Sequence, residues 1–361
     1  MNHGRGIVFL ALFALGCTGV DPQLGPSYMV STLAGTGDAG ADNGLASKAT
    51  FNQPHDVALG PDGSLYVADW SNNLIRKIAV NGTVSTYAGT GAQGLTNDVC
   101  TKATFAGPLG IAVDAASNVY VTENAGNAIR KISPSPCTVS TLAGSPSAPG
   151  TSDGVGTAAS FHAPEGLAFD ASGNTLYVAD FGNHKIRKVT INDGTVTTVA
   201  GTGTAGNANN DQPLEATFNA PRGIVVNAAG TLYVTESNDI RRITADGQVT
   251  TLAGSVTASL IDGTGPNAAF KGPRGITIDA NGNLLVGDST NNVVRQVTPD
   301  GVVTTIAGQR NGNIGMAGDI DGPADTAAFY GSGGVAVDSN GVIYVADSMN
   351  NKIRKIEWVQ P

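Results

Sequence analysis

The side chains best suited to chemistry stand at six equivalent positions. Each begins a recurring apolar segment, and most stand between a proline and a glycine. Two are arginines in consecutive copies, and a guanidinium group can hold a carboxylate through two parallel hydrogen bonds. Histidine and glutamate, which also occur there, can ligate a metal ion. These positions predict a ligand site, with sequence drift at exposed positions as the alternative. The six residues are His55, Leu109, Glu165, Arg222, Arg274 and Gly333.

A second variable set follows the acidic end of another recurring segment. Its members are Trp70, Asn124, Phe181, Ser237, Ser289 and Ser348. Trp70 and Phe181 offer large contact areas at low entropic cost, which favours recognition of a peptide or glycan. The alternative role for these aromatic side chains is packing at an edge. The fourth copy has a shortened turn at residues 237–239, which would lower the rim of the molecule there.

Both sets belong to a repeat that fills the chain. Ala-Gly recurs with its glycine at positions 35, 89, 144, 201, 254 and 308, at spacings of 54, 55, 57, 53 and 54 residues. Each unit holds four β-branched segments separated by Gly and Asn turns, which predict a four-stranded antiparallel meander. The last unit lacks its fourth strand, and residues 28–35 supply one. We therefore predict an all-β, six-bladed propeller over residues 28–361, closed by the N-terminal strand.

The arrangement of the strands places the variable residues together. The first strand of each blade begins, and the second strand ends, on one face of the ring, here called the top face. We therefore expect the first set at the mouth of the central channel and the second set around it. Loops on a rigid scaffold commonly carry binding sites.

The strand motifs Gly-Ile-Ala-Val-Asp, Leu-Tyr-Val-Ala-Asp and Ile-Arg-Lys-Ile resemble the NHL repeat. NHL propellers serve as protein-binding and RNA-binding modules, and six-bladed relatives include amidating lyases, gluconolactonase-like enzymes and strictosidine synthase-like enzymes. The fold alone therefore does not select the function. A zinc lyase would require several converging histidines, and of His55, His162 and His184 only the first has a channel position. A gluconolactonase-like site would require a Glu, Asn and Asp set, for which Glu165 is one candidate.

Residues repeated in every unit are expected to build the scaffold. An arginine recurs in the third strand and an acid at the end of the second, so we expect ion pairs rather than a ring of metal ligands. The loop before each first strand carries Asp-Gly and then Phe in several copies. We expect the Asp to cap a short helical turn and the Phe to fill the gap between blades. A calcium loop is the alternative, although the spacing differs from that of an EF-hand.

Cys100 and Cys137 belong to one repeat. We expect them on opposite faces, separated by a strand of about 17–20 Å, which exceeds the Cα limit of about 7 Å for a disulfide. We therefore expect no bridge, unless the loop that carries Cys100 folds down the outer edge of its blade.

Residues 1–16 resemble a secretory signal, with Arg5 followed by a short apolar run. Residues 14–17, Ala-Leu-Gly-Cys, resemble a bacterial lipobox and predict lipidation of Cys17. Residues 17–27 then form the lipidated end and a Gly/Pro tether. The alternative is an ordinary cleaved signal on a periplasmic or secreted protein. We expect an outer-membrane lipoprotein that faces the periplasm or the cell surface and contacts the membrane only through its anchor.

The charge of the chain restricts the classes of molecule that it is expected to bind. The net charge is −9, which disfavours nucleic acid because phosphate contacts require a basic surface. The leading hypothesis is a monomeric, non-catalytic envelope propeller that needs no cofactor and recognises a protein, peptide or glycan. The predicted contact residues are Trp70, Phe181 and the four charged or histidine residues of the first set. The alternative is a metal-dependent hydrolase or lyase that uses the channel.

Overall fold

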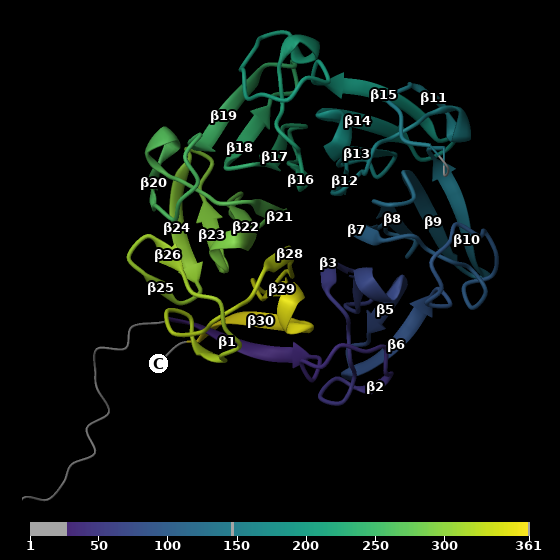
Figure 1. Ribbon diagram of the computed structural model, residues 1–361, viewed down its shortest axis with the longest axis horizontal. Coiled ribbons are helices and arrows are strands. Elements are labelled where there is room, and N and C mark those ends of the chain that lie inside the picture. Colours follow the sequence, from purple (N-terminus) through teal and green to yellow (C-terminus); the bar gives the residue numbers. More distant parts are fainter. Residues whose placement is uncertain (1–26, 146–147, 360–361) are drawn as a thin grey trace, which may run out of the picture.

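A computed structural model describes residues 27–145 and 148–359. Six antiparallel sheets lie radially around a central channel (Figure 1), which confirms the predicted six-bladed β-propeller. The second strand of most blades is buried along its whole length because neighbouring blades cover both of its faces. This burial explains the nearly continuous apolar runs in the sequence.

In the first three blades, four strands follow the chain from the channel outward, and a short strand that precedes them in the chain pairs at the outer edge of blades 1 and 3. Blade 1 contains β3 (Pro54–Leu59), β4 (Leu65–Asp69), β5 (Leu74–Ile78), β6 (Thr83–Ala88) and β2 (Gly44–Leu45). Blade 2 contains β7 (Pro108–Val113), β8 (Val119–Glu123), β9 (Ala128–Pro134) and β10 (Cys137–Ala143). Blade 3 contains β12 (Leu167–Phe169), β13 (Thr175–Asp180), β14 (Lys185–Thr190), β15 (Thr195–Ala200) and β11 (Gly154–Val155).

The other three blades repeat this order. Blade 4 contains β16 (Ile224–Val226), β17 (Leu232–Glu236), β18 (Asp239–Ile243) and β19 (Val249–Gly254). Blade 5 contains β21 (Pro273–Ile278), β22 (Leu284–Asp288), β23 (Val293–Val297), β24 (Val302–Ala307) and β20 (Gly263–Thr264). Blade 6 contains β28 (Ser332–Val337), β29 (Ile343–Asp347), β30 (Lys352–Val359), β1 (Ser27–Ala34) and β27 (Gly322–Pro323).

The remaining elements are short. A small hairpin is formed by β25 (Arg310–Asn311) and β26 (Ile314–Gly315). The single-turn 3-10 helices are η1 (Trp70–Asn72), η2 (Gly156–Ala158), η3 (Phe181–Asn183), η4 (Pro213–Glu215), η5 (Gly265–Asn267), η6 (Ser289–Asn291) and η7 (Ser348–Asn350). Within the described ranges, no helix has the length and apolar character needed to cross a membrane.

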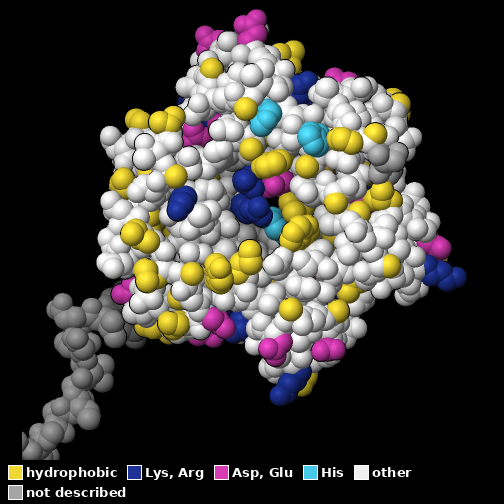
Figure 2. Space-filling view, in the orientation of Figure 1, with side chains coloured by type: hydrophobic (Ala, Val, Ile, Leu, Met, Phe, Trp, Pro, Cys, Tyr) yellow, Lys and Arg dark blue, Asp and Glu magenta, His cyan; other side chains and the backbone are white. Residues whose placement is uncertain are grey.

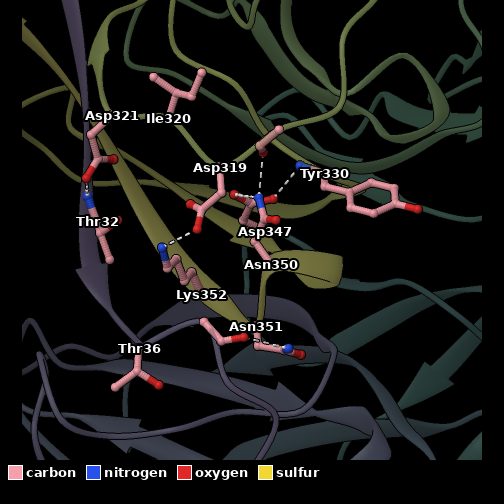
Figure 3. A network of polar contacts seen from close by, with 12 residues as sticks. Thr32, Thr36, Asp319, Ile320, Asp321, Tyr330, Asp347, Asn350, Asn351 and Lys352 are labelled. Carbon is pink, nitrogen blue, oxygen red and sulfur yellow. Dashed lines mark hydrogen bonds and ion pairs between the residues drawn. The ribbon is translucent and has the colours of Figure 1, made fainter.

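The ring closes in blade 6, as the repeat pattern predicts. Strand β1 pairs antiparallel with β30, with Tyr28 opposite Trp358. Figure 3 shows the polar contacts at this junction. The Thr32 amide donates to Asp321 at 3.1 Å, and Lys352 forms an ion pair with Asp319 at 2.5 Å. The Thr32–Asp321 contact therefore holds the closing strand in addition to its ladder, and the ion pair fixes the loop of Asp319 to β30.

Each blade contains a buried ion pair between its second and third strands, as expected from the repeat. In blade 1, Arg76 Nη1 lies 3.0 Å from Asp69 Oδ2, and both side chains are fully buried. The equivalent pairs are Arg130–Glu123, Arg187–Asp180, Arg241–Glu236, Arg295–Asp288 and Arg354–Asp347.

The same arginine also binds the loop that connects its blade with the preceding one. Arg76 donates to the Thr50 carbonyl and to Asn43 Oδ1, each at 2.9 Å, and lies 5.2 Å from the Phe51 ring centroid. Phe51 packs among apolar residues of blades 6 and 1. The predicted filling of the gap between blades by this phenylalanine is confirmed. The other five are Phe105, Phe161, Phe218, Phe270 and Phe329.

The expected helix-capping role of the loop aspartates is wrong. Asp153 accepts from Arg187 Nη2 at 2.8 Å and from the Thr198 amide at 3.1 Å. The 3-10 helix η2 has Val155 at its N-cap, with no side-chain hydrogen bond. Asp262 and Asp321 also pair with the arginines of their own blades. The buried guanidinium is a stronger partner for these carboxylates than the backbone of one helical turn.

The expectation that the cysteines stay unbridged is also wrong. Cys100 and Cys137 form a disulfide, with their Cα atoms 5.4 Å apart. The loop of Cys100 leaves the top face and runs along the outer edge of blade 2. There Val99 forms a β-bridge with Thr138, and the Cys100 amide donates to the Cys137 carbonyl at 3.0 Å. The estimate from strand length failed because it placed this loop entirely at the top face.

The buried pairs generate a stability prediction. Replacing Arg187 with Met leaves the Asp180 carboxylate buried without its cation, so we expect the free energy of unfolding to fall by about 3–5 kcal/mol. The matched control is Lys188→Met on the same strand, whose side chain is only partly buried. Urea unfolding of both variants measures the difference. Equal losses would show that the buried pair does not determine blade stability.

Candidate functional site

The first variable set converges at the top of the channel, as the topology predicts. His55, Leu109, Glu165, Arg222 and Arg274 line one cavity of about 380 Å³. Figure 2 shows basic side chains beside the central opening, with an acidic and a histidine side chain next to them. The geometry brings these residues together, and their role in binding remains a prediction.

Arg222 is held by two neighbours. Its Nη1 lies 3.3 Å from Glu165 Oε1, and its guanidinium lies 4.9 Å from the centroid of the Phe181 ring. Burial raises the pKa of Glu165, while Arg222 and Arg274 oppose that shift. Phe181 therefore packs against an arginine at the mouth, and its role in ligand recognition remains a prediction. Trp70 lines the cavity directly and is 38% exposed.

Arg274 has a different environment, because it contacts a neutral partner. Its Nη1 lies against His55 Nε2. Burial lowers the pKa of His55 well below its usual range, and Arg274 and Arg222 lower it further. Since arginine only donates, His55 Nε2 accepts and the ring proton is assigned to Nδ1. Within the described part of the chain, no carboxylate forms an ion pair with Arg274, and burial lowers its pKa.

Asp56 is a channel residue that the sequence analysis missed. It lines the channel where the other blades have glycine. These glycines are Gly110, Gly166, Gly223, Gly275 and Gly334. They allow close backbone approach, since a Cβ atom at Gly166 would lie 2.5 Å from the Arg222 carbonyl oxygen. The sequence did contain a signal for this residue, because the segment His-Asp-Val-Ala-Leu has Asp56 where the equivalent segments have glycine.

The Asp56 carboxylate joins two blades. Its Oδ1 accepts from the Val57 amide at 2.9 Å, and its Oδ2 accepts from the Ile111 amide of blade 2 at 3.0 Å. Burial raises the pKa of Asp56 to about 7, although both amides oppose the shift. Its charge therefore changes near neutral pH.

The channel narrows at this level. The space among the glycines, Asp56 and the mouth residues is about 30 Å³, with room for about two water molecules. Below it lies a wider cavity of about 270 Å³, lined largely by apolar side chains of the innermost strands. The polar chemistry of the channel is therefore concentrated above the narrow level.

The other histidines have separate places. His184 Nδ1 accepts from the Ala220 amide of the next blade at 3.0 Å. Asn73 uses its Oδ1 in the same way toward Gly107, at 3.1 Å, so His184 replaces an asparagine that links blades. His162 packs near Gly182 in the same blade. Across residues 27–145 and 148–359, no group of three or more His, Cys, Asp or Glu is placed to hold a metal ion.

Asp56 generates a prediction about pH. A folded-state pKa of about 7 against a usual 3.8 means that the folded protein binds this proton more tightly than the unfolded chain. Stability from this group is therefore lost as pH rises between about 5 and about 8, by about 2–3 kcal/mol. We expect Asp56→Gly to remove that part of the slope in urea unfolding. The exposed turn residue Asp300 provides the control, Asp300→Gly. An unchanged slope in Asp56→Gly would contradict the assignment.

Comparisons with known proteins agree with this architecture. A family model described as the NHL repeat matches residues 51–78, 161–189 and 329–356. NHL repeat-containing protein 2 of Bos taurus is 30% identical over 353 residues, covering 88% of this chain and 40% of that protein. The human protein is 32% identical over 243 residues, covering 58% of this chain and 34% of that protein. The chain thus spans less than half the length of these curated relatives.

Solved structures show the same fold at low identity. An auxiliary nutrient binding protein from Bacteroides ovatus has a TM-score of 0.69 at 16% identity, covering 93% of this chain and 78% of that chain. A gluconolactonase from Xanthomonas campestris has a TM-score of 0.58 at 13% identity, covering 91% and 89%. Proteins of this shape thus include both binding proteins and enzymes. The family-model match and the curated relatives show that this chain contains NHL repeats, and its six blades place it among the six-bladed β-propellers by fold.

Proposed function

We propose that this chain is a non-catalytic binding propeller of a bacterial cell envelope. Its top face captures a protein, peptide or glycan ligand through an acidic group, which enters the channel mouth. Arg274 and Arg222 bind that group, and Trp70 packs against the adjoining part of the ligand. The description of a similarly shaped structure as a nutrient binding protein is consistent with this proposal.

One observation carries the proposal, namely the excess positive charge at the channel mouth, where Arg222 and Arg274 face the single carboxylate of Glu165. Glu165 forms its ion pair with Arg222 and only attracts Arg274 from farther away, and His55 is neutral. Arg274 is half-buried, and partial removal of a cation from water is unfavourable without a nearby anion. A ligand carboxylate would supply that anion, with parallel hydrogen bonds to the guanidinium. The cavity of about 380 Å³ is of the size that small ligands occupy.

The proposal also includes a location in the cell. Residues 1–16 and the Cys17 lipidation site lie outside the described residues. We propose that an acyl anchor on Cys17 holds the propeller at the outer membrane, facing the periplasm or the cell surface. Strand β1 begins at Ser27, so residues 17–26 would separate the anchor from the ring.

A metal-dependent hydrolase or lyase is the second candidate. His55, Asp56 and Glu165 approach one narrow space, which favours such a site. However, each already has a protein partner. His55 contacts Arg274, Glu165 pairs with Arg222, and Asp56 accepts two backbone amides. These contacts favour structural roles over metal ligation, because His55 and Glu165 hold the arginines and Asp56 joins two blades.

Matched pairs of small molecules test the proposed function. The probes are a uronic acid against its neutral sugar, and a short peptide acid against its amide, measured by titration calorimetry. We expect the acid of at least one pair to bind more tightly than its neutral partner. Arg274→Gln should weaken that binding by at least about tenfold, because it removes the charge that meets the carboxylate.

The control is Lys271→Gln, which removes an exposed positive charge from a loop of blade 5. It should leave binding of the acid unchanged. If neutral partners bind as well as the acids, or if no acid binds, the mouth is not a carboxylate site. Equal losses in the Lys271 and Arg274 variants would indicate general attraction by the surface instead.

A further inference from the structure

The turn between β17 and β18 in blade 4 departs from the repeat. In blade 1 the equivalent turn carries Asn72, whose Nδ2 donates to Asp69 at 2.8 Å and to the Gly40 carbonyl at 2.7 Å. Asn183, Asn291 and Asn350 make the same two contacts in their blades. Blade 4 is shorter here, because β17 ends at Glu236 and β18 begins at Asp239. The bridging asparagine is therefore missing here, as it also is in blade 2, where Gly126 stands at the equivalent position.

A polar cavity of about 140 Å³ lies at this turn. It is lined by Asn207, Asn219, Glu236, Ser237, Asn238 and Asp239, together with two residues that follow β19. Asn207 is exposed, so the cavity can be reached from solvent. Each of these six side chains offers an oxygen atom, and none of the lining residues is a histidine or cysteine.

Among the described residues that line this cavity, Asp239 has a carboxylate oxygen without a partner. It is only 5% exposed, and within the described residues its Oδ1 has no hydrogen-bond partner. The equivalent residues in the other blades are Leu74, Ala128, Lys185, Val293 and Lys352. A carboxylate therefore stands at a position where no other blade has one, and one of its oxygens is buried without a donor.

The neighbouring Glu236 does not share this deficiency. Its Oε1 lies 2.8 Å from Arg241 Nη1, and its Oε2 accepts from the Asn219 amide at 2.8 Å. The repeated ion pair of blade 4 is thus complete without Asp239. The second carboxylate lies beside the first, and burial raises its pKa, while Arg241 and the side chains of Glu236 and Asn207 oppose that shift. Burial, followed by the charge of Asp239, raises the pKa of Glu236 to about 8.

We propose that this cavity binds a divalent cation of the calcium class, with the Asp239 carboxylate as its principal charged ligand. Amide and hydroxyl oxygens of Asn207, Asn238 and Ser237 are available as further ligands. Calcium accepts six to eight oxygen ligands in flexible arrangements, whereas zinc sites commonly use nitrogen and sulfur. The cation takes the place of the missing asparagine. The asparagine amide donates to oxygens of the turn and of the loop, and a cation would be coordinated by oxygens from the same two segments.

The competing account is a proton shared between Glu236 and Asp239, which would also relieve the excess charge. Titration calorimetry of the purified protein with Ca²⁺, and separately with Mg²⁺, distinguishes the two. We expect one Ca²⁺ site with a dissociation constant of about 10⁻⁴ M, in the range of extracellular calcium modules. Mg²⁺ should bind more weakly, because it requires a stricter octahedral geometry. Added Ca²⁺ should also raise the Tm relative to chelator.

Asp239→Asn should weaken Ca²⁺ binding by at least about tenfold, since it removes the charged ligand. Asp239→Leu, which restores the residue type of blade 1, should abolish binding and keep the fold. The control Asp246→Asn removes an exposed acid from the opposite end of the same blade and should bind Ca²⁺ normally. If the wild-type protein shows neither heat of binding nor a Ca²⁺-dependent Tm, the cation site is refuted. Unchanged Ca²⁺ binding in both Asp239 variants would also refute it.

Discussion

A buried arginine in the third strand of every blade is the contact on which the rest of the structure depends. Arg187 shows the arrangement, because it binds Asp180, the Ser160 carbonyl and the loop residue Asp153, and lies over Phe161. One guanidinium thus connects two strands and an interblade loop. The phenylalanine in that loop packs in an apolar cluster formed by two blades. Six such contacts set the spacing of the blades and the point where each innermost strand starts.

The position of the channel mouth follows from the way these arginines fix the interblade loops. The loop fixed by arginine and phenylalanine leads directly into the innermost strand, so its first residues always point toward the channel. The backbone approaches closely there, and five of the six blades have glycine one residue later. The side chain before that glycine has no scaffold role in common among the blades. This freedom explains why His55, Glu165, Arg222 and Arg274 occupy equivalent positions with unrelated chemistry.

Periodicity made much of this predictable from the sequence. The strands, the ring closure, the Arg–acid pairs and the convergence of the mouth residues all follow from features that recur six times. Single departures were harder to interpret. The disulfide was missed because loop length does not show which way a loop runs. The role of His184 was not predicted, because its equivalence to Asn73 depends on a hydrogen bond between blades.

Asp56 and Asp239 share a physical feature, because each is a carboxylate at a position where the repeat has none. The environments differ in one respect. Both oxygens of Asp56 accept backbone amides, whereas one oxygen of Asp239 has no donor within the described residues. The first is therefore explained by the fold alone, and the second requires a proton or a cation. At the channel mouth the excess charge is positive, because Arg222 and Arg274 face the single carboxylate of Glu165. Departures from the repeat that leave charge unmatched are the places where ligands are expected.

A crystal structure of the protein with a uronic acid bound tests the central claim most directly, because it locates the carboxylate itself. The account predicts that the carboxylate lies at the channel mouth, about 2.7–2.9 Å from guanidinium nitrogens of Arg274, with the sugar ring toward Trp70. A ligand bound elsewhere on the ring, or at the mouth with its carboxylate turned toward solvent, would contradict the account.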